Sequence, residues 1–180
     1  GVGTLSVAAF ALTGRNPATR RSLLLTDALL DTCSLENLCQ DWAVTPPPLG
    51  LRLHLLRTVA QMVQCMHATG VNHRDLYLCH ILIPQPLPDL YPPCTLIDLH
   101  RAQCRSATPY RWRRKDLAAL YFSALGIGLQ TRDLLRFMRH YHGSVRTALT
   151  EHGTLWQSVA RRAQKMQRRE QRRRARGTPP

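Results

Sequence analysis

The chain has 180 residues, of which 44% are hydrophobic, and it carries a formal net charge of +14. This apolar content is enough for a real core and excludes wholesale disorder, while the length fits one domain or part of a larger one. The positive charge favours acidic partners, such as nucleic acid, anionic lipid headgroups, or phosphorylated or carboxylated substrates.

Two apolar runs open the chain, at residues 4–12 and 21–29, and the segment between them is rich in turn formers. This pattern predicts two neighbouring strands joined in a hairpin. A short helix is expected next, with Ser34 as its N-cap, and three consecutive prolines at 46–48 should end it.

Residues 51–69 show a clear helical pattern that Gly70 should terminate. Its apolar face is formed by residues at helical spacing: Leu55, Val59, Met62 and Met66. Two short strands are then expected around a loop that carries His73, Arg74 and Asp75, with another strand near residues 94–99.

Further helices are predicted to start near Asp116 and near Thr131, and a long helix that becomes wholly basic is predicted from Gly153 onward. The order of elements, strands first and helices later with a small hairpin between them, predicts an α+β fold that is mostly helical.

The six cysteines form no C-x-x-C pair, and we interpret them as reduced thiols of a cytosolic protein. No apolar run approaches the roughly 20 residues of a transmembrane helix, and no signal peptide is recognised at the N-terminus. The sequence starts without Met, as though already inside a strand, and we expect an incomplete or trimmed chain.

Asp75 and Asp98 are the two acidic residues that indicate chemistry, because each follows a short apolar strand where loop side chains can converge. A phosphoryl-transfer site needs one carboxylate to orient the acceptor hydroxyl and take its proton, and another to hold Mg²⁺ against the nucleotide phosphates. His80 stands where a further residue usually completes the metal shell.

Four separated segments together resemble the lipopolysaccharide core heptose (I) kinase family of Gram-negative bacteria, within the protein-kinase-like superfamily. They are residues 14–43, 70–83 ("GVNHRDLYLCHILI"), 95–105 ("TLIDLHRAQCR") and 111–141. The resemblance covers residues 1–141, and it implies a protein-kinase-like fold: mostly the helical C-terminal lobe with the last strands of the N-terminal lobe.

The resemblance implies that Asp75 is the catalytic base and that Asp98 binds the metal ion. Protein kinases have Asn at the position of His80 and Phe-Gly where this chain has Leu99 and His100. Both departures are similar to the heptose kinase pattern and favour a sugar acceptor. For His80, a metal contact and a satisfied buried histidine both stay open.

The resemblance also implies supporting residues. The backbone groups of Asp27 and Leu29 would bond the adenine in a hinge between two lobes, while His73 and Arg74 would brace the catalytic loop. Asp116 resembles the acid that braces this loop, and a helix N-cap is its simplest interpretation. The implied domains are 1–26, a remnant of the N-terminal lobe; 27–33, the hinge; 34–152, the helical lobe; and 153–180, a basic helix or tail.

The expected function is ATP-dependent phosphorylation of a heptose hydroxyl on the lipopolysaccharide inner core, with ATP and Mg²⁺ as cofactors. Because the inner core is acidic, arginines after Asp98 are candidate contacts for it: Arg101, Arg105, Arg111, Arg113 and Arg114. The alternatives are a kinase for another sugar, such as Kdo, and a catalytically silent pseudokinase or basic binding module.

The family has its Gly-rich loop, strand Lys and partner Glu upstream, whereas the first Lys of this chain is Lys115. We therefore expect the activity of the parent protein and not necessarily of this fragment. A zinc site is disfavoured, since the available ligands have spacings that match no tetrahedral pattern: Cys79, His80, Cys94, His100 and Cys104.

Residues 161–176 contain nine Lys or Arg and one Glu, so this segment alone carries +8. Two interpretations stay open for it: a solvated helix end, or attraction to the anionic inner leaflet of a membrane, to which each basic residue contributes about 1 kcal/mol. The segment lacks the interleaved aromatics of base-stacking proteins, so no nucleic acid is expected. The expected location is the cytoplasm, with peripheral contact to the inner membrane in the second interpretation.

Overall fold

The computed structural model describes residues 2–16, 18–88 and 92–177, in which helices and small sheets are combined. The helices are α1 (Leu35–Cys39), α2 (Leu49–Ala68), α3 (Tyr110–Ser123), α4 (Thr131–His142), α5 (Val145–Thr150) and α6 (Gly153–Ala175), with one-turn 3-10 helices η1 (Leu78–His80) and η2 (Leu99–Arg101). The strands are β1 (Val7–Thr13), β2 (Arg21–Thr26), β3 (Thr32–Ser34), β4 (Val71–Asn72), β5 (Ile81–Pro84), β6 (Thr95–Leu96) and β7 (Gln103–Cys104). The prediction of a mostly helical mixture of helix and strand is confirmed.

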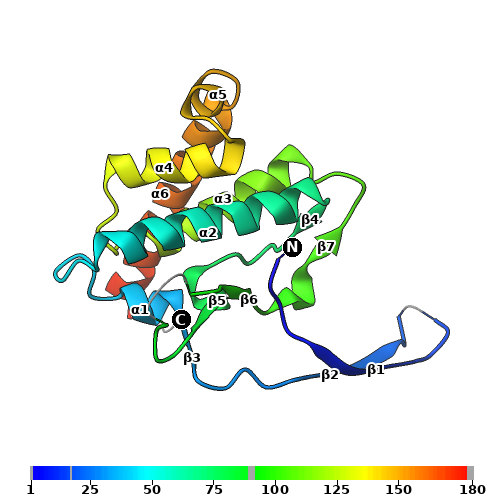
Figure 1. The fold of residues 1–180 in the computed structure, drawn as a ribbon. Helices are drawn as coiled ribbons and strands as arrows, with labels where there is room; N and C mark the ends of the chain where they lie inside the picture. The colour runs from blue at the N-terminus through cyan, green and yellow to red at the C-terminus, as the bar shows by residue number, and fades with distance from the viewer. Residues whose placement is uncertain (1, 17, 89–91, 178–180) are drawn as a thin grey trace.

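The helices gather on one side of the molecule and the short strands lie beneath them (Figure 1). The strands form three antiparallel groups, β1–β2, β3–β5–β6 and β4–β7. In Figure 1 the group β3–β5–β6 lies below α2, whereas β4–β7 lies beside the end of α2. The loop with Asp75 runs from β4 to β5, and the loop with Asp98 runs from β6 to β7. The predicted hairpin is β1–β2, which extends away from the helices (Figure 1).

The predicted apolar face of α2 is buried in the main hydrophobic core. Leu55, Val59, Met62 and Met66 are each at most 7% exposed, and Gly70 follows the helix with a φ of +82°. A row of apolar side chains on one face stabilises the helix by packing more than by intrinsic propensity. Both the face and the stop are therefore as predicted.

The N-cap of α1 is Ser34, whose Oγ accepts a hydrogen bond from the amide of Asn37 at 3.2 Å, as predicted. The start of α3 was predicted near Asp116 but lies at Tyr110, after Pro109, so the N-cap interpretation of Asp116 is wrong. The first turn of α3 is rich in basic residues, and for this reason it shows no apolar periodicity from which a start could be read. The short helix α5, which Ser144 caps, was not predicted.

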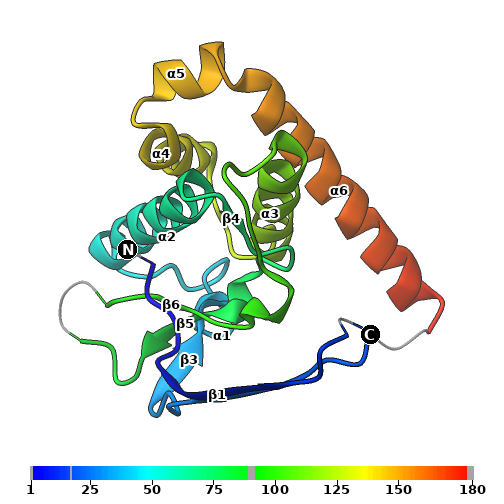
Figure 2. The same ribbon diagram turned by 90° about the vertical axis from the view of Figure 1, so that its right-hand side faces the viewer.

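Helix α6 changes character along its length. Its first half buries apolar side chains in the core: Leu155, Trp156, Val159 and Ala163. Its second half is exposed and basic, and it runs past the core toward the side on which the hairpin lies (Figure 2). The predicted long helix with a basic end is thus present, with Glu170 as the one acidic residue of that end. Among the described residues, no helix combines the length and the hydropathy that crossing a bilayer requires.

The β1–β2 hairpin is exposed on both faces. Phe10 is 64% exposed, Leu23 58% and Leu24 57%, so the described residues leave large apolar side chains uncovered here. A two-stranded hairpin is at best marginally stable by itself, and its apolar faces normally pack against other elements.

Candidate active site

Asp116 holds the loop that follows β4. Its Oδ2 accepts a hydrogen bond from the amide of His73 at 2.8 Å, and its Oδ1 accepts one from the amide of Arg74, also at 2.8 Å. The Asp116 side chain is fully buried, and Arg74 has a φ of +77°, which is uncommon for a residue other than glycine. A buried carboxylate that accepts two amide hydrogen bonds stabilises this strained backbone.

His67, at the end of α2, supports Asp116 from the other side. Its Nε2 lies 3.3 Å from Asp116 Oδ2 and its Nδ1 lies 2.7 Å from the hydroxyl of Tyr141. A carboxylate only accepts, so Nε2 carries the proton, and in the neutral ring Nδ1 accepts from Tyr141. Burial raises the pKa of Tyr141, which keeps its hydroxyl protonated as the donor. The sequence analysis did not predict this series of hydrogen bonds from Tyr141 through His67 to Asp116. The one signal in the sequence was a histidine next to the apolar face of α2, just before the loop.

His73 connects the two loops that carry the acidic residues. Its Nε2 donates to the carbonyl of Ile97 at 2.9 Å, directly before Asp98, and its Nδ1 lies 3.4 Å from the amide of Asp75. The imidazole is completely buried, so these bonds also satisfy its two nitrogens. The loops are therefore joined through a side chain that was predicted to be structural.

His80 makes a second connection. Its Nδ1 lies 2.7 Å from the carbonyl oxygen of Asp75, and its Nε2 lies 3.3 Å from Asp98 Oδ2. Because a carbonyl only accepts, Nδ1 carries a proton. Nε2 then faces the Asp98 carboxylate, and this approach is favourable when the ring is doubly protonated or when a cation lies between the two groups. His80 stacks on His73 with ring centroids 5.8 Å apart.

Asp98 and Asp75 differ in their surroundings. Asp98 has a φ of +62° and its side chain is 36% exposed; its Oδ1 contacts Nδ1 of His100. The Asp75 side chain is 19% exposed, and its Oδ2 pairs with the Arg101 guanidinium at 2.8 Å. Arg101 was predicted as an acceptor contact, and the structure places it on Asp75. Both carboxylates reach the surface on adjoining loops.

The donor set fits a magnesium ion that is shared with a nucleotide. Among the described residues, no group of three or more His, Cys, Asp or Glu side chains could hold a metal by itself, and all six cysteines are free. Mg²⁺ is usually held by one or two carboxylates, with phosphate and water oxygens completing the shell. Asp98, with His80 beside it, is such a partial set, although a ring nitrogen is a less favourable ligand than oxygen.

The predicted hinge residues lie in the extended segment between β2 and β3. The amide of Asp27 donates to the carbonyl of Ser6 at 3.0 Å, and the side chain of Leu29 is 38% exposed. The amide of Asp27 is therefore engaged in a hydrogen bond within the chain.

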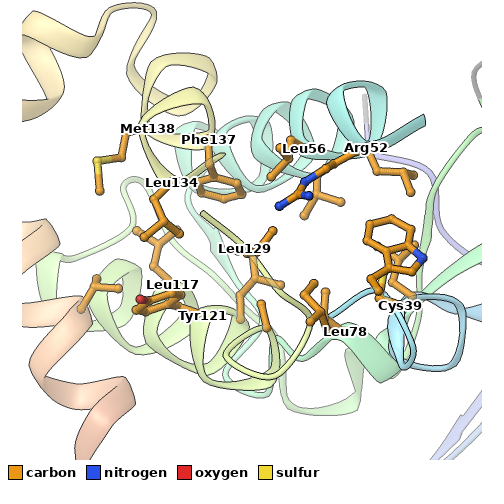
Figure 3. A pocket seen from close by; sticks show the side chains of 18 of the residues that line it. Cys39, Arg52, Leu56, Leu78, Leu117, Tyr121, Leu129, Leu134, Phe137 and Met138 are labelled. Carbon is orange, nitrogen blue, oxygen red and sulfur yellow. The ribbon is translucent and has the colours of Figure 1, made fainter. Parts of the chain in front are cut away.

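A separate apolar cavity of about 160 Å³ lies between the helices. Figure 3 shows side chains from α2, α3 and α4 surrounding it, with Arg52 at one side. Its lining includes Cys39, Leu56, Leu78, Leu117, Tyr121, Leu129, Leu134, Phe137 and Met138. Sequence reasoning did not predict this cavity.

Comparison with known proteins agrees with the predicted resemblance. Residues 1–141 match the lipopolysaccharide kinase (Kdo/WaaP) family. The chain is 47% identical over 177 residues to a Pseudomonas aeruginosa protein named lipopolysaccharide core heptose(I) kinase WaaP. This match covers 96% of this chain and 65% of that relative. An Escherichia coli protein of the same name is 43% identical over 175 residues, which are 96% of this chain and 66% of the relative.

A solved structure titled "WaaP in complex with acyl carrier protein" matches with a TM-score of 0.86 at 47% identity. The match covers 91% of this chain and 69% of that chain. The chain thus spans about two thirds of the length of these relatives. From the match over most of its length and from the identities to these relatives, the chain belongs to the lipopolysaccharide kinase (Kdo/WaaP) family.

Proposed function

We propose that this chain forms the catalytic part of a kinase that transfers the terminal phosphoryl group of ATP to a heptose hydroxyl of the lipopolysaccharide inner core. The observation that carries the proposal is the junction of two loops, in which His73 and His80 both link the segment of Asp75 to the segment of Asp98. The choice of a heptose as the acceptor rests on the names of the two relatives. In this proposal the protein works at the cytoplasmic side of the inner membrane.

Asp75 would orient the acceptor hydroxyl and take its proton during the transfer. Its side chain is partly exposed and pairs with Arg101, which is itself 46% exposed and so can move to admit a substrate. The hydrogen bonds from the backbone amides of His73 and Arg74 to Asp116 would keep the loop in place while Arg101 moves. A fixed loop favours a short and reproducible approach of the base to the hydroxyl.

Asp98 and His80 would hold Mg²⁺, which supplies positive charge to the nucleotide phosphates when it is bound. The carbonyl of Asp27 and the backbone of Leu29 would contact the adenine. His73 and Asp116 would act by positioning the loop and not by touching a substrate, and the backbone amide of Arg74 would take part in this positioning.

The lobe assignment is part of this proposal. Residues 1–26 would belong to the smaller lobe, 27–33 to the hinge, 34–152 to the helical lobe and 153–180 to a basic helix. Two observations support it: the β1–β2 hairpin exposes apolar side chains on both faces, and the relatives are longer than this chain. A further sheet over the hairpin would cover those side chains.

The test is the change Asp75→Asn in the protein at its full genomic length. We expect the rate of phosphate transfer to core oligosaccharide to fall by about 10²–10⁴-fold, the usual contribution of a general base, while thermal stability stays near that of the wild type. Asp41→Asn, at an exposed position after α1, is the matched control and should leave transfer unchanged. Unchanged transfer by Asp75→Asn would reject the assignment, and the sugar phosphorylated in the product separates heptose from Kdo.

A protein partner is a second proposal, and we infer it from the solved neighbour, whose title names an acyl carrier protein. The apolar cavity between the helices would take the acyl chain of such a carrier. Calorimetric titration should show that the acyl-loaded carrier binds at least tenfold more tightly than the unloaded carrier. Equal affinity for the two forms would remove the cavity from this proposal.

A peripheral membrane contact is a third proposal, which rests on the basic half of α6. Four arginines and one lysine lie there at helical spacing on one face of α6: Arg161, Lys165, Arg168, Arg169 and Arg172. Anionic headgroups of the inner leaflet would be attracted to this charge. The contact would bring the enzyme near an acceptor that is anchored in the same membrane.

A further inference from the structure

Four cationic side chains surround the ring of Trp112. The guanidinium carbons of Arg74, Arg105 and Arg111 lie 5.2, 5.7 and 5.1 Å from the ring centroid, and Nζ of Lys115 lies 5.5 Å from it. They come from the loop after β4, the residue directly after β7 and the first turns of α3. We call these five residues the Trp112 cluster.

The positive charge of the Trp112 cluster is poorly balanced. Among the described residues, no member forms an ion pair with a carboxylate, and Arg105 bonds to the neutral amide oxygens of Asn72 and Gln103 at 2.7 and 2.6 Å. The ring face attracts each cation, but four like charges around one ring also repel one another. A bound anion would relieve that repulsion.

The nearby carboxylates already have other partners. Asp75 forms an ion pair with Arg101, and Asp116 accepts hydrogen bonds from two backbone amides of the loop. Burial lowers the pKa of Lys115; Asp75 acts against this shift, whereas the charges of Arg101 and Arg74 add to it. Lys115 therefore lies within the electrostatic reach of the candidate base.

Two donors of the Trp112 cluster are unused. Arg74 Nε and Trp112 Nε1 are both shielded from solvent and have no hydrogen-bond partner among the described residues. Most shielded polar atoms in proteins do have a partner, so such donors often mark a place where a ligand binds. Arg111 is exposed, which opens the cluster to solution on one side.

We propose that the Trp112 cluster binds an oxyanion of the acceptor substrate, a carboxylate or a phosphate, next to the candidate base. This inference rests on the proposed function. Lys115 interacts electrostatically with Asp75, and Arg74 directly precedes Asp75 in the chain, so an anion held by the cluster would lie near the group that takes the proton of the acceptor. Among the described residues, no member of the cluster forms a hydrogen bond or an ion pair with Asp98 or His80, which favours the acceptor over the nucleotide as the ligand of the cluster. Charge-assisted bonds from Arg and Lys are the usual means of recognising such groups.

The first experiment measures binding without turnover. In the protein at its full genomic length, inorganic phosphate is titrated against the indole N–H signal of Trp112 in NMR spectra, at constant ionic strength set with potassium chloride. The wild type should show a saturable shift. The double variant Arg111→Gln with Lys115→Gln should bind phosphate at least about tenfold more weakly. The control Arg132→Gln, an exposed arginine on α4, should match the wild type.

The second experiment measures transfer to core oligosaccharide. The double variant should raise the KM for the acceptor by about tenfold or more, while the KM for ATP stays within about twofold. An acceptor whose carboxyl groups have been reduced to alcohols, and one from which phosphates have been removed, identify the source of the oxyanion. The modified acceptor that lacks it should show a raised KM with the wild type and no further rise with the double variant.

Three outcomes would overturn the inference: an unsaturable phosphate shift, a shift that is equal in wild type and double variant, or a raised KM for ATP in place of the acceptor. The proposed function fails separately, when the wild type transfers no phosphate to core oligosaccharide. In that case the titration alone decides whether the Trp112 cluster is an oxyanion site.

Discussion

Gly70 shows how one residue can determine the geometry of the candidate site. It lies between α2 and β4 with a φ of +82°, and its carbonyl accepts the amide of Arg105 at 3.0 Å. A Cβ at this position would lie 1.8 Å from the carbonyl oxygen of Arg105. Glycine is therefore required twice, once for the left-handed backbone and once for the close approach to the chain next to it.

Gly70→Ala is expected to destabilise the fold by roughly 2–4 kcal/mol, because the backbone conformation becomes strained and β4 must separate from β7. Thermal or urea unfolding measures this loss. Gly50→Ala is the control, since a Cβ there meets nothing within 4 Å and lies at the start of α2; its stability should be unchanged or raised by up to about 1 kcal/mol. A Gly70→Ala protein as stable as the wild type would contradict the structure around β4.

At the scale of elements, a buried acidic residue joins α2 to α4. Asp133 is 3% exposed and contacts the guanidinium of Arg52, which also donates to the carbonyl of Gly128 at 2.9 Å. Asp133 also completes a capping box, in which it accepts the amide of Gln130 at 3.0 Å. One side chain thus starts α4 and fixes it on α2, beside the apolar cavity.

Asp133→Ala is expected to cost about 3–5 kcal/mol, because it leaves the partly buried guanidinium of Arg52 without its carboxylate and removes the cap of α4. Asp133→Asn should cost less, since an amide oxygen can still accept from Gln130. Chemical denaturation measures both. A free energy of unfolding for Asp133→Ala within about 1 kcal/mol of the wild-type value would contradict this role of Asp133.

At the scale of the whole molecule, the charge and the uncovered apolar surface are separated from the folded core. The basic half of α6 extends beyond the packed helices and the hairpin extends below them (Figures 1 and 2). Both features contribute little to the core, so they are available for contacts outside this chain. The proposed membrane contact therefore has a direct test.

Sedimentation with vesicles measures that contact. The protein should bind vesicles that contain anionic lipids, bind zwitterionic vesicles much less, and be released by salt. Neutralising four arginines of α6 to Gln should weaken binding at least tenfold, since each contributes about 1 kcal/mol: Arg161, Arg168, Arg169 and Arg172. The matched control neutralises four exposed arginines elsewhere: Arg15, Arg20, Arg132 and Arg139. Equal loss in both sets would show that total charge, and not α6, drives binding.

Local patterns predicted most of the elements. The cap at Ser34, the apolar face of α2 and the stop at Gly70 depend on residues within a few positions of each other, so they are legible in the sequence. The start of α3 is not legible, because its first turn carries few apolar residues. Asp75, Asp98 and His80 were named from the residue pattern, the resemblance implied their roles and the supporting residues, and these chemical roles stay predictions.

By itself, the sequence determined the family, the mixed and mostly helical composition, and the two acidic loops. Only the tertiary structure decided which groups meet: His67 with Asp116, 49 positions apart; Arg52 with Asp133, 81 positions apart; and four cations around Trp112. The physical reason is range. Helix periodicity and capping act between neighbours in the chain, whereas a buried hydrogen bond or an unbalanced cluster of charges exists only once packing has brought distant segments together.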